Sequence, residues 1–305
     1  MSHFLKANKL VCLFCFFVNL AAAQSQDDLS TLLDDEKKSE PISSTFKTTR
    51  IVNAHSIETV KKRGLDFRVS HKFGDIAGAA GGVQTLYGLD NASNIRIAFE
   101  YGVTNKLTVG FGRSKIQQAL DGYLKYRLLH QTTDNKIPVS MTLFTNMVVI
   151  PEKNIGGNYS KASHRFSYTY QAIVGRKFND FISLQISPTI VHRNFISDPN
   201  DKNDLFSLGL GGRIKLTKRF AVLADYFWSF SKYRKYGNSN FYFPPLGIGI
   251  EIETGGHVFH MFFTNSPGIV ENQFLVNSSS SWNEGQAKFG FNISRTFGIG
   301  KSKRN

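Results

Sequence analysis

The sequence predicts an all-β protein: a transmembrane, antiparallel, up-and-down β-barrel of about 12 strands, with short periplasmic turns and longer outer loops. Three observations predict this fold. Segments of roughly ten residues alternate apolar and polar side chains from Leu65 to Phe297, tight and long connections alternate between them, and a segment with the composition of a secretory leader precedes them. Because successive strand residues point to opposite faces, each segment has one apolar and one polar face.

Residues 1–23 are predicted to be a signal peptide. Lys6 and Lys9 form its basic start, residues 10–20 form its apolar core, and a small-residue cleavage site ends at Ala23. A spanning helix needs about 20 apolar residues, so the short core disfavours the alternative of an uncleaved anchor. We therefore expect an exported chain, cleaved near Ala23 and located in a bacterial outer membrane.

The rest of the chain divides into four segments. Residues 24–44 are polar and acid-rich and are predicted to be a disordered periplasmic tail, because this composition buries too little apolar surface to fold alone. Residues 45–63 have β character and are expected as an N-terminal strand or as a segment in the barrel mouth. Residues 64–297 form the predicted barrel, and residues 298–305 form a basic C-terminal tail.

Hydrophobic alternation and turn residues place about twelve strands within the barrel. They are expected at 64–74, 93–102, 106–115, 118–129, 137–150, 163–177, 181–194, 204–217, 219–231, 243–254, 257–265 and 286–297. About fourteen strands would result if residues 45–55 and one loop segment also paired into the wall. The alternative fold is a soluble β-sandwich, whose strands would be shorter and whose loops would not alternate so regularly in length.

Charged residues in the polar phase of the strands are predicted to line the lumen. These predicted lumen charges are Arg68, Lys72, Arg96, Glu100, Lys125, Arg127, Arg165, Arg213, Lys215, Glu251 and Glu253. Their excess of cations predicts a pore with a mild preference for anions. The alternative is a ladder of salt bridges that fills a narrow lumen and braces the wall, since charges of both signs occur together on several strands.

No catalytic, cofactor or metal site is predicted, and we do not expect an enzyme. His257 and His260 are three residues apart, which on a strand sends their side chains to opposite faces. The sequence has no Gly-x-Ser-x-Gly nucleophile elbow. Both cysteines, Cys12 and Cys15, lie in the leader, so the mature chain would have no disulfide or thiol nucleophile. The basic residues are dispersed along the strands, and nucleic-acid binding is not expected despite a formal net charge of +14.

Four stretches of the mature chain carry a family resemblance. They are residues 46–60 (FKTTRIVNAHSIETV), 65–76 (LDFRVSHKFGDI), 86–114 and 252–274. Together they resemble a β-barrel family of Bacteroidetes that is known only as a domain of unknown function. The resemblance spans residues 46–297 and implies an outer-membrane barrel, with no activity, substrate, cofactor or catalytic residue to carry over.

Two functions are consistent with the sequence. The first is a passive, porin-like channel for small solutes with a mild anion preference. The second is a non-conducting barrel that anchors or docks a periplasmic or surface partner. The expected partners are outer-membrane lipid and lipopolysaccharide, the outer-membrane assembly machinery, and a periplasmic partner bound through residues 24–60.

Overall fold

The computed structural model describes residues 39–153, 159–234 and 242–299. The expected leader (1–23), residues 24–38 of the expected acidic tail and residues 300–305 of the basic tail lie outside these described residues. Among the described residues, no helix is long and apolar enough to cross a membrane.

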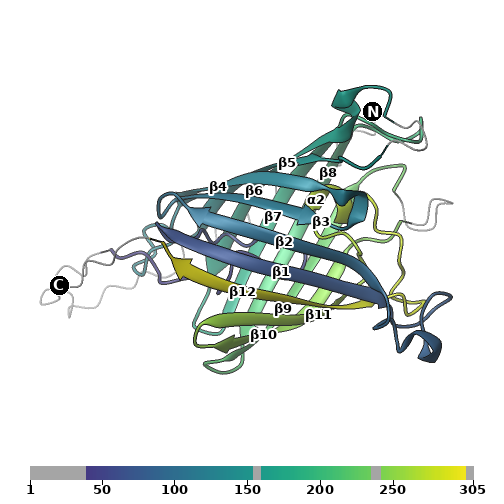
Figure 1. The fold of residues 1–305 in the computed structure, drawn as a ribbon. Coiled ribbons are helices and arrows are strands. Elements are labelled where there is room, and N and C mark those ends of the chain that lie inside the picture. Colours follow the sequence, from purple (N-terminus) through teal and green to yellow (C-terminus); the bar gives the residue numbers. More distant parts are fainter. Residues whose placement is uncertain (1–38, 154–158, 235–241, 300–305) are drawn as a thin grey trace, which may run out of the picture. The chain divides into compact units, whose positions relative to one another are not determined.

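Twelve antiparallel strands close into one barrel, in which each strand pairs with its neighbours in sequence and β1 pairs with β12 (Figure 1). The strands are β1 (Gly64–Asp75), β2 (Ala92–Gly102), β3 (Leu107–Ser114), β4 (Leu120–Leu129), β5 (Ser140–Val149), β6 (Phe166–Lys177), β7 (Ile182–Arg193), β8 (Asp204–Lys215), β9 (Phe220–Phe230), β10 (Leu246–Thr254), β11 (His257–Thr264) and β12 (Lys288–Gly298). The predicted fold class is confirmed.

The connections differ in length between the two ends of the barrel. At one end, which we call the short-turn end, β2 joins β3 through residues 103–106, and β10 joins β11 through Gly255 and Gly256. At the other end, the long-loop end, β1 joins β2 through residues 76–91, and β11 joins β12 through residues 265–287. The connections at the long-loop end contain four short helices. Three are 3-10 helices, η2 (Val83–Thr85), η3 (Ile116–Gln118) and η4 (Ala162–Arg165), and one is an α-helix, α2 (Glu271–Phe274).

The outer face of the wall is apolar because one phase of each strand consists of large aliphatic and aromatic side chains. β7 shows this most simply: its residues alternate between exposed and buried from Ile182 to Val191. The exposed residues include Ile182, Leu184, Ile186 and Ile190. An apolar surface of this extent facing outward is what a closed barrel presents to lipid.

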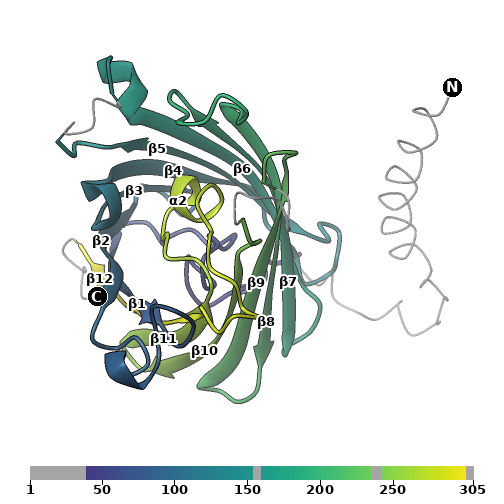
Figure 2. The ribbon, with the colours of Figure 1, turned by 90° about the vertical axis from the view of Figure 1, so that its right-hand side faces the viewer.

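Residues 45–60 lie largely inside the barrel, whereas residues 61–63 are exposed. They contribute no strand to the wall, which is closed by β1 to β12 alone, so the fourteen-strand alternative is wrong for the described chain. The end-on view shows this purple segment within the ring of strands, together with α2 (Figure 2). The lumen is therefore occupied by two parts of the chain that are far apart in sequence.

Candidate functional site: the filled lumen

The inner face of the wall is mainly polar. Its buried inward side chains include Thr108, Thr142, Asn146, Gln171, Ser183, Gln185, Ser187, Thr189, Ser207 and Ser229, in addition to the charged residues described below. Side chains of this kind suit a water-containing interior, whereas the interior of a compact soluble barrel is filled with branched apolar residues.

Residues 45–60, here called the N-terminal plug, form a hairpin that enters from the short-turn end. Arg50 and His55 pair as an isolated bridge, and two hydrogen bonds, from the Ile51 amide to the Ala54 carbonyl and from the Ser56 amide to the Thr49 carbonyl, close its turn at 2.9 Å each. Every residue from 48 to 57 is buried. The hairpin is too short to stand alone in water, so the surrounding wall must hold its shape.

Asp225 on β9 binds the tip of the plug. Its carboxylate accepts hydrogen bonds from the backbone amides of Val52, Asn53 and Ala54, at 3.0, 2.6 and 2.8 Å from Oδ2. The side-chain amide of Asn53 donates to Oδ1 at 2.9 Å. Consecutive backbone amides that converge on one anion form a nest, and hydrogen bonds to a charged acceptor are the stronger class. One wall residue therefore fixes the whole turn.

The carbonyl groups of the plug are bound by other strands. The ammonium of Lys125 on β4 donates to the carbonyls of Ser56 and Glu58 at 2.8 and 2.6 Å. Thr142 on β5 donates to the Ile57 carbonyl at 2.6 Å, and Gln185 on β7 donates to the His55 carbonyl at 2.8 Å. Backbone groups that are not paired in a sheet are thus satisfied by wall side chains, as buried polar groups require.

The plug also has an apolar side. Phe46, Ile51, Val52 and Ile57 form one buried cluster with five inward-facing residues of the wall. Those wall residues are Tyr123, Phe144, Ile173, Leu223 and Phe262. Apolar residues from five strands of a mostly polar inner wall, β4, β5, β6, β9 and β11, therefore face the apolar residues of the plug. This contact adds a hydrophobic contribution to the hydrogen bonds at the tip.

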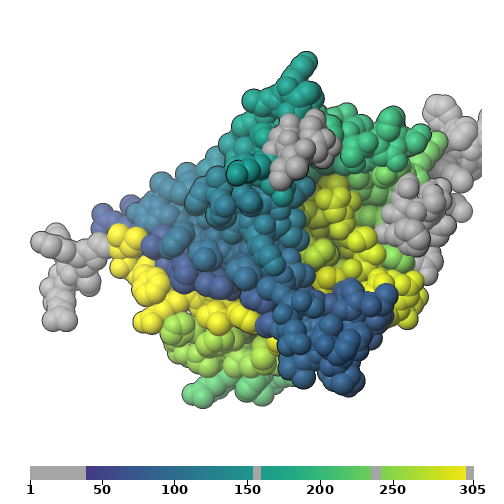
Figure 3. All heavy atoms as spheres, turned by 45° about the vertical axis from the view of Figure 1, so that its right-hand side comes forward, coloured from purple at the N-terminus to yellow at the C-terminus, as the bar shows by residue number. Residues whose placement is uncertain are grey.

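The β11–β12 loop (residues 265–287) folds into the barrel at the long-loop end. Its helix α2 is fully buried, and Phe274 packs against Phe227 of β9 with ring centroids 5.0 Å apart. The amide of Asn272 donates to Ser167 at 2.8 Å. In the space-filling view, the yellow part of the chain that includes this loop fills the region between the blue and the green ends of the wall (Figure 3).

The plug and the β11–β12 loop meet inside the barrel. Arg50 of the plug donates to the Ile269 carbonyl at 3.0 Å. Lys72 on β1 donates to Asn53 of the plug at 2.8 Å and to the carbonyls of Ser266 and Gly268 of the loop at 3.0 and 2.5 Å. The plug and the β11–β12 loop are therefore joined inside the lumen, directly and through Lys72.

Comparison with known proteins gives a family. The family model described as "Membrane bound beta barrel domain (DUF5777)" matches residues 46–297, which include the plug as well as the wall. The chain belongs to this family. The family is named for its location and fold and not for an activity. Among curated proteins, none matches this chain in sequence.

Several solved structures of channels resemble this membrane-bound β-barrel domain at low identity. The NanC porin matches with 9% identity and a TM-score of 0.46, covering 76% of this chain and 98% of the porin. The KdgM porin matches with 8% identity and a TM-score of 0.46, covering 77% and 99%. The COG4313 outer membrane channel from Pseudomonas putida F1 matches with 13% identity and a TM-score of 0.45, covering 81% and 100%.

Six of the predicted lumen charges are buried inside the barrel: Arg68, Lys72, Arg96, Glu100, Lys125 and Glu251. Arg96 forms a two-point contact with Asp121 of β4, at 2.9 and 2.5 Å. Arg68 lies 3.3 Å from Asp66 and 4.0 Å from Glu100. Arg68 also donates to the hydroxyl of Thr49 in the plug at 3.0 Å. Lys72 and Lys125 bind carbonyls of the β11–β12 loop and of the plug, so Arg96 braces the wall alone whereas the other three cations also hold internal segments.

The other predicted lumen charges lie near the ends of the barrel. Arg127 binds Glu58 of the plug at 2.8 Å, and Arg213 binds Glu251 at 2.7 Å. Glu253 is partly exposed and binds Lys47 at 2.6 Å. Lys215 ends β8 at the short-turn end. Arg165 belongs to η4 and not to a strand, and it donates to the carbonyls of Ile150 and Glu152 at 2.7 Å each.

No group of three or more His, Cys, Asp or Glu side chains within the described ranges could hold a metal ion. His260 faces inward and lies 3.3 Å from Glu251, whereas His257 belongs to the exposed end of β11 and lies 3.5 Å from Arg295. The expected separation of these two histidines is therefore what the structure shows.

Sequence reasoning missed Asp225 and Asn53, which join the wall to the plug. It also missed Glu271 of α2, which accepts a hydrogen bond from Asn146 of β5 at 3.4 Å. A signal for them exists in β9, where the large apolar residues Leu223 and Phe227 lie on the inward face on either side of Asp225. A strand of a water-filled barrel has one polar face, so an inward apolar patch indicates that another part of the chain packs against it.

Proposed function

We propose that this membrane-bound β-barrel domain is a non-enzymatic, porin-like channel of the outer membrane whose solute path is closed at rest by the N-terminal plug. The observation that carries the proposal is a polar inner wall around a plug whose tip is bound by one wall residue. Among the carboxylates of the described residues, only that of Asp225 binds the amides of this tip. The short-turn and long-loop ends support an outer-membrane orientation with the plug entering from the periplasm.

Burial energies explain why the plug closes the path. The four apolar plug residues, Phe46, Ile51, Val52 and Ile57, are at most 4% exposed. Each contributes about 1.5–3 kcal/mol on burial, or roughly 6–12 kcal/mol together. Since about 1.4 kcal/mol corresponds to a factor of ten, fewer than about one molecule in ten thousand would have the plug withdrawn. Small solutes would then pass only when another force withdraws the plug.

The mild anion preference belongs to the state with the plug withdrawn. In the closed state Arg127 forms an ion pair with Glu58 of the plug, and Lys125 donates to the Glu58 carbonyl. Lys72 donates to the side chain of Asn53. Withdrawal frees Lys125 and Arg127 and removes Asn53 from Lys72, which keeps its hydrogen bonds to the β11–β12 loop. On the wall, Asp225 loses its hydrogen bonds to the plug tip and Glu253 loses its ion pair with Lys47. Freed cations in a narrow lumen favour anions.

Single-channel conductance of the full chain in a planar bilayer under a salt gradient tests this proposal. We expect the unchanged protein to be silent. The variant Asp225→Asn/Ile57→Ser, which weakens both the tip and the apolar contact, should show openings with an anion-biased reversal potential. The control Asp121→Asn changes a buried wall carboxylate that binds Arg96 and no plug residue, and it should stay silent. Steady conductance of the unchanged protein would contradict closure by the plug.

A second candidate function follows from the same filled lumen: a non-conducting barrel that docks a periplasmic partner. Residues 48–57 are buried, so within the predicted docking region 24–60 a partner would have to bind mainly before the plug. A pull-down that requires residues 24–44, together with a barrel that stays silent after the plug has been shown to leave, would favour this function. Lipopolysaccharide and the assembly machinery remain predicted partners, and nucleic acid is not proposed.

A further inference from the structure

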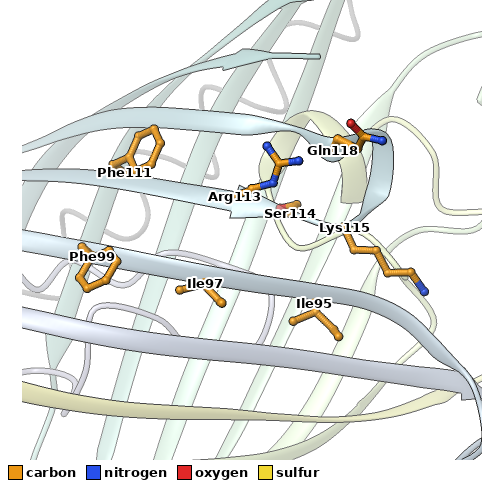
Figure 4. A pocket seen from close by; sticks show the side chains of 8 residues that line it. All are labelled: Ile95, Ile97, Phe99, Phe111, Arg113, Ser114, Lys115 and Gln118. Carbon is orange, nitrogen blue, oxygen red and sulfur yellow. The ribbon is translucent and has the colours of Figure 1, made fainter. Parts of the chain in front are cut away.

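A groove of about 700 Å³ lies on the outer face of the wall, between β2 and β3 near the long-loop end. Ile95, Ile97 and Phe99 from β2 and Phe111 from β3 form its apolar surface, as Figure 4 shows. Ile97, Phe99 and Phe111 are 49%, 44% and 54% exposed. These side chains belong to the outward phase of the strands, so the groove faces the lipid and not the lumen.

Two cations lie at the end of this groove that is closest to the long loops. Arg113 ends the outward phase of β3, and Lys115 follows in the β3–β4 connection; both are exposed (Figure 4). The ammonium of Lys115 donates to the Ala92 carbonyl at 2.5 Å, which holds it over the end of β2. Gln118, whose backbone is in the left-handed region with φ 51°, completes the lining on this side.

These cations differ from the other arginines at the same end of the barrel. Arg193 and Arg234 both bind Asp201, at 2.9 and 2.5 Å. Neither Arg113 nor Lys115 makes an ion pair with any described residue. A guanidinium on a lipid-facing surface is costly without a counter-charge, and long basic side chains at strand ends reach toward the headgroup region. The pair therefore has the position and charge to bind an anionic headgroup.

The surface beside Phe111 is also open. Phe111 pairs across β3 and β4 with Gly122, and a Cβ atom added at Gly122 would meet no other atom within 4 Å. The outer surface is therefore unobstructed on the β4 side of Phe111. Apolar walls with two cations at one end match an amphiphile with an anionic head.

We propose that this groove binds one anionic, phosphate-bearing lipid of the outer leaflet, with an acyl chain along Ile97, Phe99 and Phe111 and a phosphate at Arg113 and Lys115. The site is independent of conductance, because it lies on the opposite face of the wall from the plug. It would retain an annular lipid at a defined position on the barrel.

Native mass spectrometry of the full chain in detergent, titrated with dioleoyl phosphatidylglycerol or dioleoyl phosphatidylcholine, tests the site. Two basic residues beside an anionic headgroup should favour phosphatidylglycerol by about 10–30-fold. Arg113→Gln/Lys115→Gln should abolish this preference. The control Lys161→Gln/Lys202→Gln removes equal charge from exposed loop positions at the same end and should retain it.

A second variant tests the acyl-chain contact. Phe99→Ala/Phe111→Ala removes two aromatic side chains that line the groove. It should weaken the binding of both lipids several-fold while keeping the preference for the anionic headgroup. Inorganic phosphate should not displace the lipid. The proposal is overturned if the two lipids bind equally to the unchanged protein, if the Arg113/Lys115 variant keeps the preference, or if inorganic phosphate competes at the concentration of the lipid.

Discussion

The replacement Asp225→Asn should release the tip of the plug without enlarging or reducing the side chain. Asp225 accepts hydrogen bonds from the backbone amides of Val52, Asn53 and Ala54 and from the side chain of Asn53. Hydrogen bonds to a charged acceptor contribute about 1.5–3 kcal/mol, against about 0.5–1.5 kcal/mol for neutral partners. An amide also turns a donor toward Asn53.

The expected loss is roughly 3–4 kcal/mol of plug-binding free energy, about 1 kcal/mol for each hydrogen bond that becomes neutral. This loss would raise the population with the plug withdrawn by about 10²–10³-fold. It does not exceed the roughly 6–12 kcal/mol contributed by the apolar plug residues. The variant should therefore remain closed for most of the time and open often enough to measure.

A single cysteine in the plug measures this opening. Ala54 is 2% exposed and packs among Leu205, Phe227 and Phe274, so Ala54→Cys would react with a water-soluble thiol reagent only after withdrawal. The two natural cysteines, Cys12 and Cys15, would be changed to serine. In the regime where reaction is slower than closing, the labelling rate follows the open population. Asp225→Asn should accelerate labelling by about 10²–10³-fold.

The control Asp121→Asn distinguishes release of the plug from general loosening of the barrel. It leaves Arg96 as an unpaired buried cation, which costs about 3–5 kcal/mol, yet Asp121 contacts no plug residue. Equal labelling rates in Asp225→Asn and its parent would refute the assignment of Asp225 to the plug. So would an equal acceleration by Asp121→Asn.

Three further results are expected. Gly110→Ala would place a Cβ atom 2.1 Å from the ring of Tyr123 and should lower the free energy of unfolding by about 1–3 kcal/mol in a urea titration in detergent. The control Gly122→Ala, whose added Cβ atom would meet no atom within 4 Å, should leave it unchanged. In the plug-released variant, Lys72→Gln/Lys125→Gln should remove the anion bias of the reversal potential, and an unchanged bias would assign selectivity to other residues. Burial alone would raise the pKa of Asp201 in the β7–β8 loop, but hydrogen bonds from Arg234 and Arg193 lower it to about 2. Because the pKa of Asp201 is lower in the folded protein, ionised Asp201 should stabilise the loop fully above about pH 4 and lose this effect as the pH falls through 2. Faster amide hydrogen exchange of residues 194–203 at low pH would show this loss.

The wall could be predicted from the sequence because its determinants are local. Alternation with a period of two marks each strand, and glycine or asparagine marks the turns, so the twelve strands and the two classes of connection follow from short windows. The predicted ends of the strands agree less well with the structure than their number and order. The strand expected to begin at residue 163 begins at Phe166, since residues 162–165 form η4. This difference moves Arg165 out of the wall.

The plug could not be predicted in the same way. Residues 45–55 have the β character of a wall strand, and their position inside the barrel depends on partners that are far away in sequence. Asp225 is 171 to 173 residues from the amides that it binds, and Ile269 is 219 residues from Arg50. Only the inward apolar residues of the wall, such as Leu223 and Phe227, indicated that the lumen holds more than water.

The two candidate functions are linked by the free energy of the plug. Its C-terminal end continues directly into β1 at Gly64, so a withdrawn plug would stay tethered at the short-turn end and could return. Withdrawal requires roughly 6–12 kcal/mol, and a partner present at about 1,000 times its Kd for the withdrawn state supplies about 4 kcal/mol of it. A partner can shift the equilibrium only if it binds the withdrawn state more tightly than the closed one. A periplasmic protein that recognised plug residues buried in the closed state would meet that condition, because it could engage them only after withdrawal. Docking at the N-terminal segment and opening of the lumen would then be two parts of one function.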